Sequence, residues 1–201
     1  MPSWWMPRRR GSPPRSQTRR GAVLGRLIGD DAAVTSREPA ADLCPTCGRP
    51  RDAHDRHVRF RLPDPVVSAP ARELTEGTWM SHADANQSVM MMVPNVGTFV
   101  RVLIPVHLTG GYTVTFGAWL GVHPDDLQRA FSVWTSPSYV DLRLEGRLAN
   151  ALPAWDVFAV PAEAAVKDPD HTPYLVGSSD SVLSEVLTQE WPHETILSGL
   201  P

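Results

Sequence analysis

The sequence lacks most of the features by which an enzyme, a secreted protein or a membrane protein is usually identified. Only two of its 201 residues are cysteine, too few for a disulfide framework, which favours a reducing cytoplasm as the expected compartment. No apolar run approaches the roughly 18 residues that a membrane-spanning helix needs. No nucleophile elbow, phosphate-binding loop, HExxH zinc motif or dinucleotide-binding motif is present. These absences predict a soluble protein without a recognisable catalytic motif.

Lysine is nearly absent too, since Lys167 is the only lysine among 19 basic residues. The arginines are unevenly spread: the first 26 residues hold seven of them and no acid, so the rest of the chain carries a net charge of about −10. An acidic body argues against nucleic-acid binding outside the N-terminal segment, because neutralising phosphates requires a basic face. Residues 1–42 are rich in Pro, Arg, Ser and Gly and show no periodicity, which predicts a disordered basic leader.

A β-hairpin is the clearest element of the remaining chain. Phe99–Leu108 and Tyr112–Val122 are rich in β-branched and aromatic residues, and Gly110-Gly111 between them predicts a two-residue turn. In that register His107 would face the core. Trp119 is flanked by glycines on its own face of the strand, so we expect its ring to be accessible to a ligand or partner.

Two helices and a further strand follow the hairpin. One helix begins at Pro124 and ends before the Ser136-Pro137 step, because apolar residues recur with helical spacing between them. The second helix is predicted over Ser181–Glu190, and Ala154–Val160 is predicted as a strand. We therefore expect residues 43–195 to form a single α+β domain: a small antiparallel sheet built on the hairpin, with two or three helices and a short Cys/His turn at the N-terminus.

The sequence CPTCGRPRDAHDRH, residues 44–57, contains the strongest candidate site. Cys44, Cys47, His54 and His57 are the ligand types of a closed tetrahedral zinc site, and Pro45 with Gly48 favours a tight turn that turns both thiolates toward one metal. The six residues between Cys47 and His54 suit a zinc knuckle better than a classical zinc finger. Zinc is the one cofactor that we expect. Two alternatives stay open, a structural turn without metal and a redox pair of cysteines.

Catalytic candidates outside this stretch are sparse. His171 follows Asp168 and Asp170 closely enough for a general-base arrangement, although a solvated loop explains the same residues. An enzyme of this sequence would have to assemble its site from separate loops such as Asp168–His171 and Asp141–Glu145.

Several short motifs, taken in order, resemble one bacterial family. They are the Cys44–Gly48 turn, the Ile104-Pro105 step, Trp119 before the helix from Pro124, and the segment from Leu148 to Pro153. Together they are similar to the bacterial proteins grouped as domain of unknown function 2199, over roughly residues 43–190. The resemblance implies a shared fold and brings no activity with it.

The function that we predict from these observations is a non-enzymatic binding or interaction module with a structural zinc site. Its partner would be a protein or a small molecule. The alternative is a hydrolase-type enzyme of unknown substrate, built on the loops named above.

Overall fold

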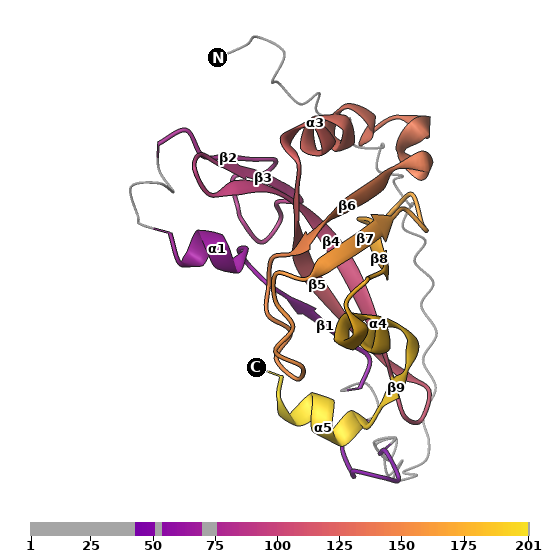
Figure 1. Cartoon of the computed structure of the whole chain (residues 1–201). Coiled ribbons are helices and arrows are strands. Elements are labelled where there is room, and N and C mark those ends of the chain that lie inside the picture. The colour runs from indigo at the N-terminus through magenta and orange to yellow at the C-terminus, as the bar shows by residue number, and fades with distance from the viewer. Residues whose placement is uncertain (1–42, 51–53, 70–75, 201) are drawn as a thin grey trace, which may run out of the picture. The chain divides into compact units, whose positions relative to one another are not determined.

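The computed structural model describes residues 43–50, 54–69 and 76–200, and the predicted basic leader lies outside them. Its longest elements are the two strands of the predicted hairpin, β4 (Gly97–Leu108) and β5 (Tyr112–Val122). They pair antiparallel along their whole length, from Thr98↔Val122 to Leu108↔Tyr112 (Figure 1). This part of the prediction is confirmed.

Five strands close into a barrel. From β5 the chain of pairings passes through three further antiparallel neighbours, β6 (Arg143–Leu148), β7 (Pro161–Ala165) and β8 (Tyr174–Gly177). β8 then pairs in parallel with β4 at Leu103↔Tyr174, and β4 pairs with β5, which completes the ring.

Four shorter strands extend this barrel. β1 (Arg56–Arg59) pairs in parallel with β5. β3 (Met90–Val93) pairs with β4, and β2 (Trp79–Met80) pairs with β3. β9 (Glu190–Trp191) runs parallel to the end of β4, next to the hairpin turn. These four strands therefore extend the sheet beyond the five strands that close the barrel.

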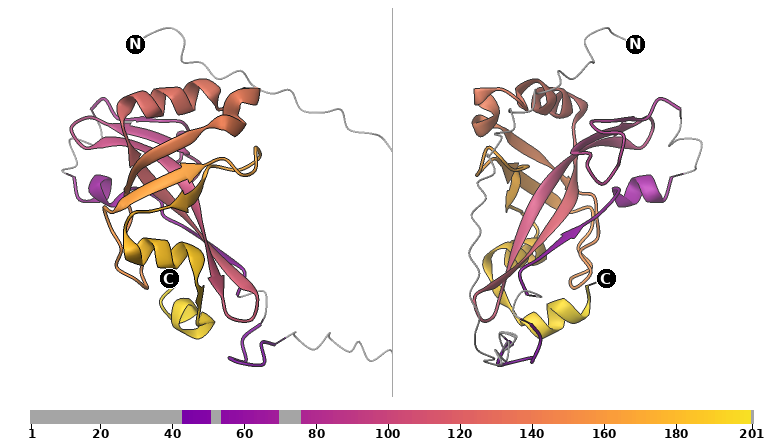
Figure 2. Two further views of the ribbon diagram at one scale, coloured as in Figure 1. Left: turned by 45° about the vertical axis from the view of Figure 1, so that its right-hand side comes forward. Right: turned by 180° about the vertical axis from the view of Figure 1, so that it is seen from behind.

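The helices are short and lie around the barrel. They are α1 (Asp64–Val67), α3 (Pro124–Val133), the 3₁₀ helix η2 (Pro137–Asp141), α4 (Ser181–Thr188) and α5 (His193–Ser198). α3 lies at one end of the barrel and α5 at the opposite end, beside the turn that contains the cysteines (Figures 1 and 2). None of the helices in the described part of the chain is long and apolar enough to cross a membrane.

Two apolar clusters hold the strands together. The larger fills the barrel and takes alternate residues of β5, such as Val114, Phe116 and Leu120, all fully buried. A smaller cluster lies on the outer face, where α1 covers Trp119, Phe99 and Met91. Because strand residues alternate between faces, β5 contributes to both clusters and is buried on both sides over its middle, from Phe116 to Leu120.

The predicted α+β class is wrong: the protein is mostly β, with a closed five-stranded barrel, additional strands and only small helices. The helices from Pro124 and Ser181 are present. Two of the barrel strands that were not predicted have weak apolar patterns. RLEGRL, which forms β6, places only alternate residues inside, and PAEAA, which forms β7, is alanine-rich and has low strand propensity. Ala154–Val160, predicted as a strand, forms none.

The hairpin turn differs from the prediction by one residue. Leu108 pairs with Tyr112, so three residues connect the strands, and Gly110 and Gly111 adopt φ angles of 89° and 81°. A shift of one residue exchanges the two faces of a strand. His107 is consequently exposed and does not face the core. The expected accessibility of Trp119 is also wrong, since its ring is 0% exposed.

Candidate metal centre

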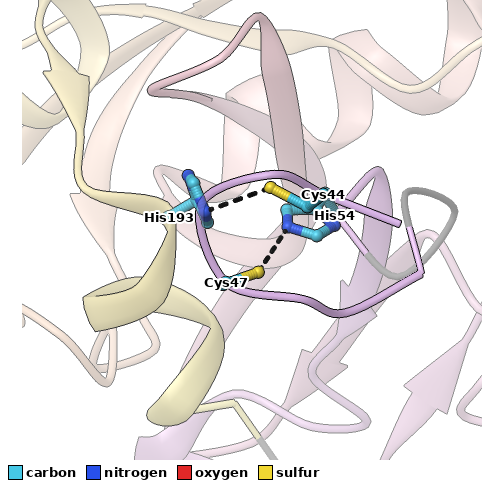
Figure 3. Close-up of side chains that lie close together, drawn as sticks. All are labelled: Cys44, Cys47, His54 and His193. Atoms are coloured by element: carbon cyan, nitrogen blue, oxygen red, sulfur yellow. Dashed lines mark hydrogen bonds between the residues drawn. The ribbon is translucent and has the colours of Figure 1, made fainter. Parts of the chain in front are cut away.

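Four potential metal ligands meet at the hairpin end of the barrel (Figure 3). Cys44, Cys47, His54 and His193 each present one ligand atom, and these atoms all lie within 4.8 Å of one another. Three of them belong to the set predicted from the sequence, and the fourth comes from the far end of the chain. The group is close enough to hold a metal ion.

The cysteines are positioned by a tight turn over residues 43–50. The amide of Gly48 donates to the carbonyl of Cys44 at 2.8 Å, and Cys44 donates in turn to Arg49 at 2.8 Å. Gly48 adopts a φ of 68°, a conformation that favours glycine. This geometry turns both sulfur atoms to the same side of the backbone.

His54 is positioned by the start of β1. The parallel register of β1 with β5 begins at Arg56↔Val114, which carries the preceding His54 to the first residue of β5. Its imidazole lies against the ring of Tyr112, with centroids 4.4 Å apart, and is 0% exposed. Packing by a neighbouring aromatic ring thus fixes the side chain before any metal arrives.

His193 comes from the opposite end of the chain. It is the first residue of α5, directly after β9, whose pairing with β4 places it beside the hairpin turn. Its Nε2 lies 3.6 Å from Sγ of Cys44, across 149 positions of sequence. No spacing motif relates two residues so far apart, so the sequence pattern offered no signal for this ligand.

Two sulfur–nitrogen distances within the group are close to those of a tetrahedral site. Zn–S bonds of about 2.3 Å and Zn–N bonds of about 2.0–2.1 Å place sulfur and nitrogen about 3.6 Å apart at the tetrahedral angle. The observed separations are 3.6 Å for Cys44 and His193 and 3.2 Å for Cys47 and His54.

Both histidines are held in the tautomer that a metal requires. Nδ1 of His54 lies 3.0 Å from the carbonyl of Pro50, and Nδ1 of His193 lies 3.1 Å from the carbonyl of Thr109. A carbonyl only accepts, so these contacts favour a protonated Nδ1 that donates; at His193 the hydroxyl of Thr109, 3.0 Å from Nδ1, is a second partner that can accept or donate. Each Nε2 is then left with a free lone pair, and both lone pairs point at the sulfur atoms.

The surroundings of Cys44 favour its thiolate form. Hydrogen bonding from the amide of Cys47 lowers the pKa of Cys44 to about 6, against the opposing effect of burial, and the amide of Thr46, the Cys47 side chain and nearby His193 act in the same direction. Cys44 and His193 are each 3% exposed. Thiolate is the form that binds metals.

His57 lies elsewhere. It is three residues beyond His54 on β1, and in a strand such residues point to opposite faces. His57 therefore lies on the outer face of the barrel, where it lines a hollow with Leu103 and His171. On a helix the same HxxH spacing would bring the two rings together.

The residues proposed for an enzyme lie on neighbouring segments. Nδ1 of His171 lies 2.8 Å from Oδ2 of Asp168, so this pair is formed on an exposed loop. The hydroxyl of Tyr139 in η2 donates to the carbonyl of His171 at 2.7 Å, which ties this loop to the segment that contains Asp141. His171 and Glu145 nevertheless line different hollows.

The protein-family comparison agrees with the resemblance seen in the sequence. Residues 43–187 match the model of a family described as an uncharacterized protein conserved in bacteria, DUF2199. The chain belongs to this family. Comparison with curated proteins and with solved structures finds no match. The DUF2199 region contains Cys44, Cys47 and His54, and it ends before His193.

Proposed function

We propose that the protein binds one structural Zn²⁺ through Cys44, Cys47, His54 and His193, and that the metal fastens the N-terminal turn to helix α5. The observation that carries this proposal is the orientation of both imidazoles: each Nδ1 is committed to a carbonyl, and each Nε2 faces a sulfur atom. Without a cation, each Nε2 can accept a hydrogen bond from the thiol beside it, and a zinc ion would take the place of both thiol protons.

Zinc is favoured over other metals by the donor set. Two thiolates and two imidazoles are a common structural zinc combination, and the two thiolates neutralise the charge of the ion. A structural turn without metal and a redox pair remain the competing hypotheses. The placement of an imidazole nitrogen beside each sulfur favours metal binding over a thiol pair that exchanges with a disulfide.

The metal would support a binding function and no catalysis. Four protein ligands fill a tetrahedral site, which leaves no open position for water or substrate. The hydrolase-type alternative gains no support from the hollows, since His171 and Glu145 line different ones. We infer a non-enzymatic module whose partner is a protein or a small molecule.

Cobalt substitution tests the proposed site. Co²⁺ added to the metal-free full chain should give the intense visible bands of a tetrahedral cobalt thiolate, and zinc should abolish them at one equivalent. Cys47→Ser and His193→Ala should weaken or remove the bands, whereas His57→Ala should leave them unchanged. A spectrum of octahedral cobalt in the wild type would refute the site.

A further inference from the structure

A groove on the outer face of the barrel is separate from the metal centre. Two adjoining hollows of about 340 and 360 Å³ share His57, Leu103 and His171, so they form one continuous groove. We call it the β1 groove. Each hollow lies at the lower end of the size range for small-molecule sites, and neither contains any of the four clustered ligands.

The walls of the β1 groove come from distant segments of the chain. Its floor is the outer face of β4 and β5, at Leu103 and Gly117. β1 flanks β5 on one side with His57 and Arg59, while the segment before β8 flanks β4 on the other side with His171. The groove therefore exists only in the folded barrel.

Gly117 leaves the floor open. A Cβ at this position would lie 3.3 Å from Nε2 of His57 and 3.4 Å from Cγ of Arg59. Both side chains thus extend over the space that a larger residue would occupy. Because Gly117 has no side chain, the side chains of His57 and Arg59 can lie over the same point of the strand.

A buried positive charge lies beside this floor, because Arg101 is on the same face of β4 as Leu103. Arg101 is 1% exposed, and its guanidinium donates to the carbonyls of Ser88, Phe60, Gly117, Arg61 and Ala85. Its Cζ also lies 4.2 Å from the ring centroid of Trp119. Burial lowers the pKa of Arg101 to about 9, with a contribution from Arg59, so the group stays charged at neutral pH. No carboxylate forms an ion pair with it in the part of the chain that the structure describes.

The charges of the groove depend on its histidines. The charged and titratable residues that line it are Asp55, Arg56, His57, Arg59, Arg101, Asp170, His171 and Tyr174. Asp55 accepts from the amide of Thr113 at 2.8 Å, and Asp168 lies 2.8 Å from Nδ1 of His171. With both histidines neutral the lining carries a net charge of +1, which Asp168 reduces to 0, and each protonation of a histidine adds one positive charge. A buried cation in low dielectric attracts an anion more strongly than an exposed one.

The two histidines can donate to such an anion. Asp168 holds Nδ1 of His171 at 2.8 Å, so Nε2 is the ring atom left for the groove. The pKa of His57 is lowered, first by burial and then by Arg59, Arg101 and His171. A bound anion would offset these repulsions and favour the protonated form of His57.

We propose that the β1 groove binds a small molecule through a phosphate group, with Arg59, His57 and His171 as donors and Arg101 as a fixed charge beside them. Three separate donors suit a phosphate dianion, which offers three free oxygens, better than a carboxylate, which offers two. The phosphate can belong to the free inorganic ion or to an ester, because the donors recognise the same group in both.

Imidazole NMR on the full chain tests this proposal. Inorganic phosphate and phenyl phosphate are titrated separately at constant ionic strength. We expect saturable shifts of the His57 and His171 resonances and a higher pKa for His57 in the bound state. Tighter binding of phenyl phosphate would identify an ester as the ligand, and equal binding would identify the free ion.

Matched variants separate the site from general charge effects. Arg59→Gln should weaken phosphate binding about tenfold, as expected for a charge-assisted hydrogen bond. Gly117→Val should abolish binding by filling the floor. Arg129→Gln removes the same charge from an exposed position on α3, outside the groove, and should leave affinity unchanged.

The proposal fails if the shifts do not saturate, or if Arg59→Gln binds as tightly as the wild type. It also fails if Arg129→Gln loses as much affinity as Arg59→Gln, since that would indicate nonspecific attraction. Arg59 is exposed, so its replacement tests the groove even where Gly117→Val does not fold. The result is independent of the zinc proposal, because the two sites share no residue.

Discussion

Replacing His193 with alanine separates the stability that the metal provides from the stability that the side chain provides alone. His193 donates from Nδ1 to Thr109 in the absence of metal, and in the proposed complex it also binds zinc through Nε2. The first contribution is lost in the variant under all conditions. The second is lost only when zinc is present, so a chelator distinguishes the two.

The structure allows the size of both effects to be worked out. Loss of one buried hydrogen bond costs about 1 kcal/mol. If removal of one ligand weakens zinc binding at least a hundredfold, the metal-dependent loss at fixed free zinc is about 2.7 kcal/mol or more. For a chain of this size, 1 kcal/mol corresponds to about 2–4 °C in Tm, so the metal-dependent part is about 5–11 °C.

Thermal unfolding followed by near-UV circular dichroism, with zinc and with EDTA, measures both parts. We expect His193→Ala to lower Tm strongly in zinc and only by about 2–4 °C in EDTA. His107→Ala is the matched control, because His107 is exposed on the neighbouring strand end and belongs to no cluster. A wild-type Tm that EDTA leaves unchanged would refute the reasoning, as would an equal loss in His193→Ala under both conditions.

Three further changes have defined outcomes. Thr109→Val removes the hydroxyl that lies 3.0 Å from Nδ1 of His193, and should weaken zinc binding by about 10–100-fold in a competition assay with a chromophoric chelator. Arg101→Met leaves buried carbonyls without donors, and should lower the free energy of unfolding in urea by about 3–5 kcal/mol. Arg59→Gln removes a positive charge beside His57 and should raise the pKa of that imidazole toward its ordinary value, as measured by NMR titration. The folded state favours the neutral ring, because the pKa of His57 is lowered there. The free energy of unfolding should therefore fall as the pH drops below about 6.5, where the imidazole of the unfolded chain becomes protonated, and Arg59→Gln should reduce this loss of stability.

The sequence predicted the elements whose pattern is local and strong. The hairpin is evident because two long runs of β-branched and aromatic residues flank Gly110-Gly111. The helix from Pro124 is evident because proline and two acids open an apolar stripe. β6 and β7 were missed because their inward positions are few and their outward positions charged or alanine, so barrel closure depends on pairings that no local pattern shows.

The same contrast applies to the candidate site. The CxxC turn is a local feature, and its shape follows from Gly48 and the short hydrogen-bonded loop. The fourth ligand depends on topology. His57 shares the HxxH spacing with His54, but strand geometry points it to the other face, while the pairing of β9 with β4 carries His193 into its place. The β1 groove likewise joins β1 to the segment before β8, and no motif connects them.

The most direct test of the central claim is the zinc content of the full chain and its variants, measured by mass spectrometry under non-denaturing conditions. We expect one zinc per wild-type chain, one in His57→Ala, and a loss of the metal in Cys44→Ser and His193→Ala. A wild-type chain without zinc would contradict the account. So would a series in which His57→Ala loses the metal and His193→Ala keeps it.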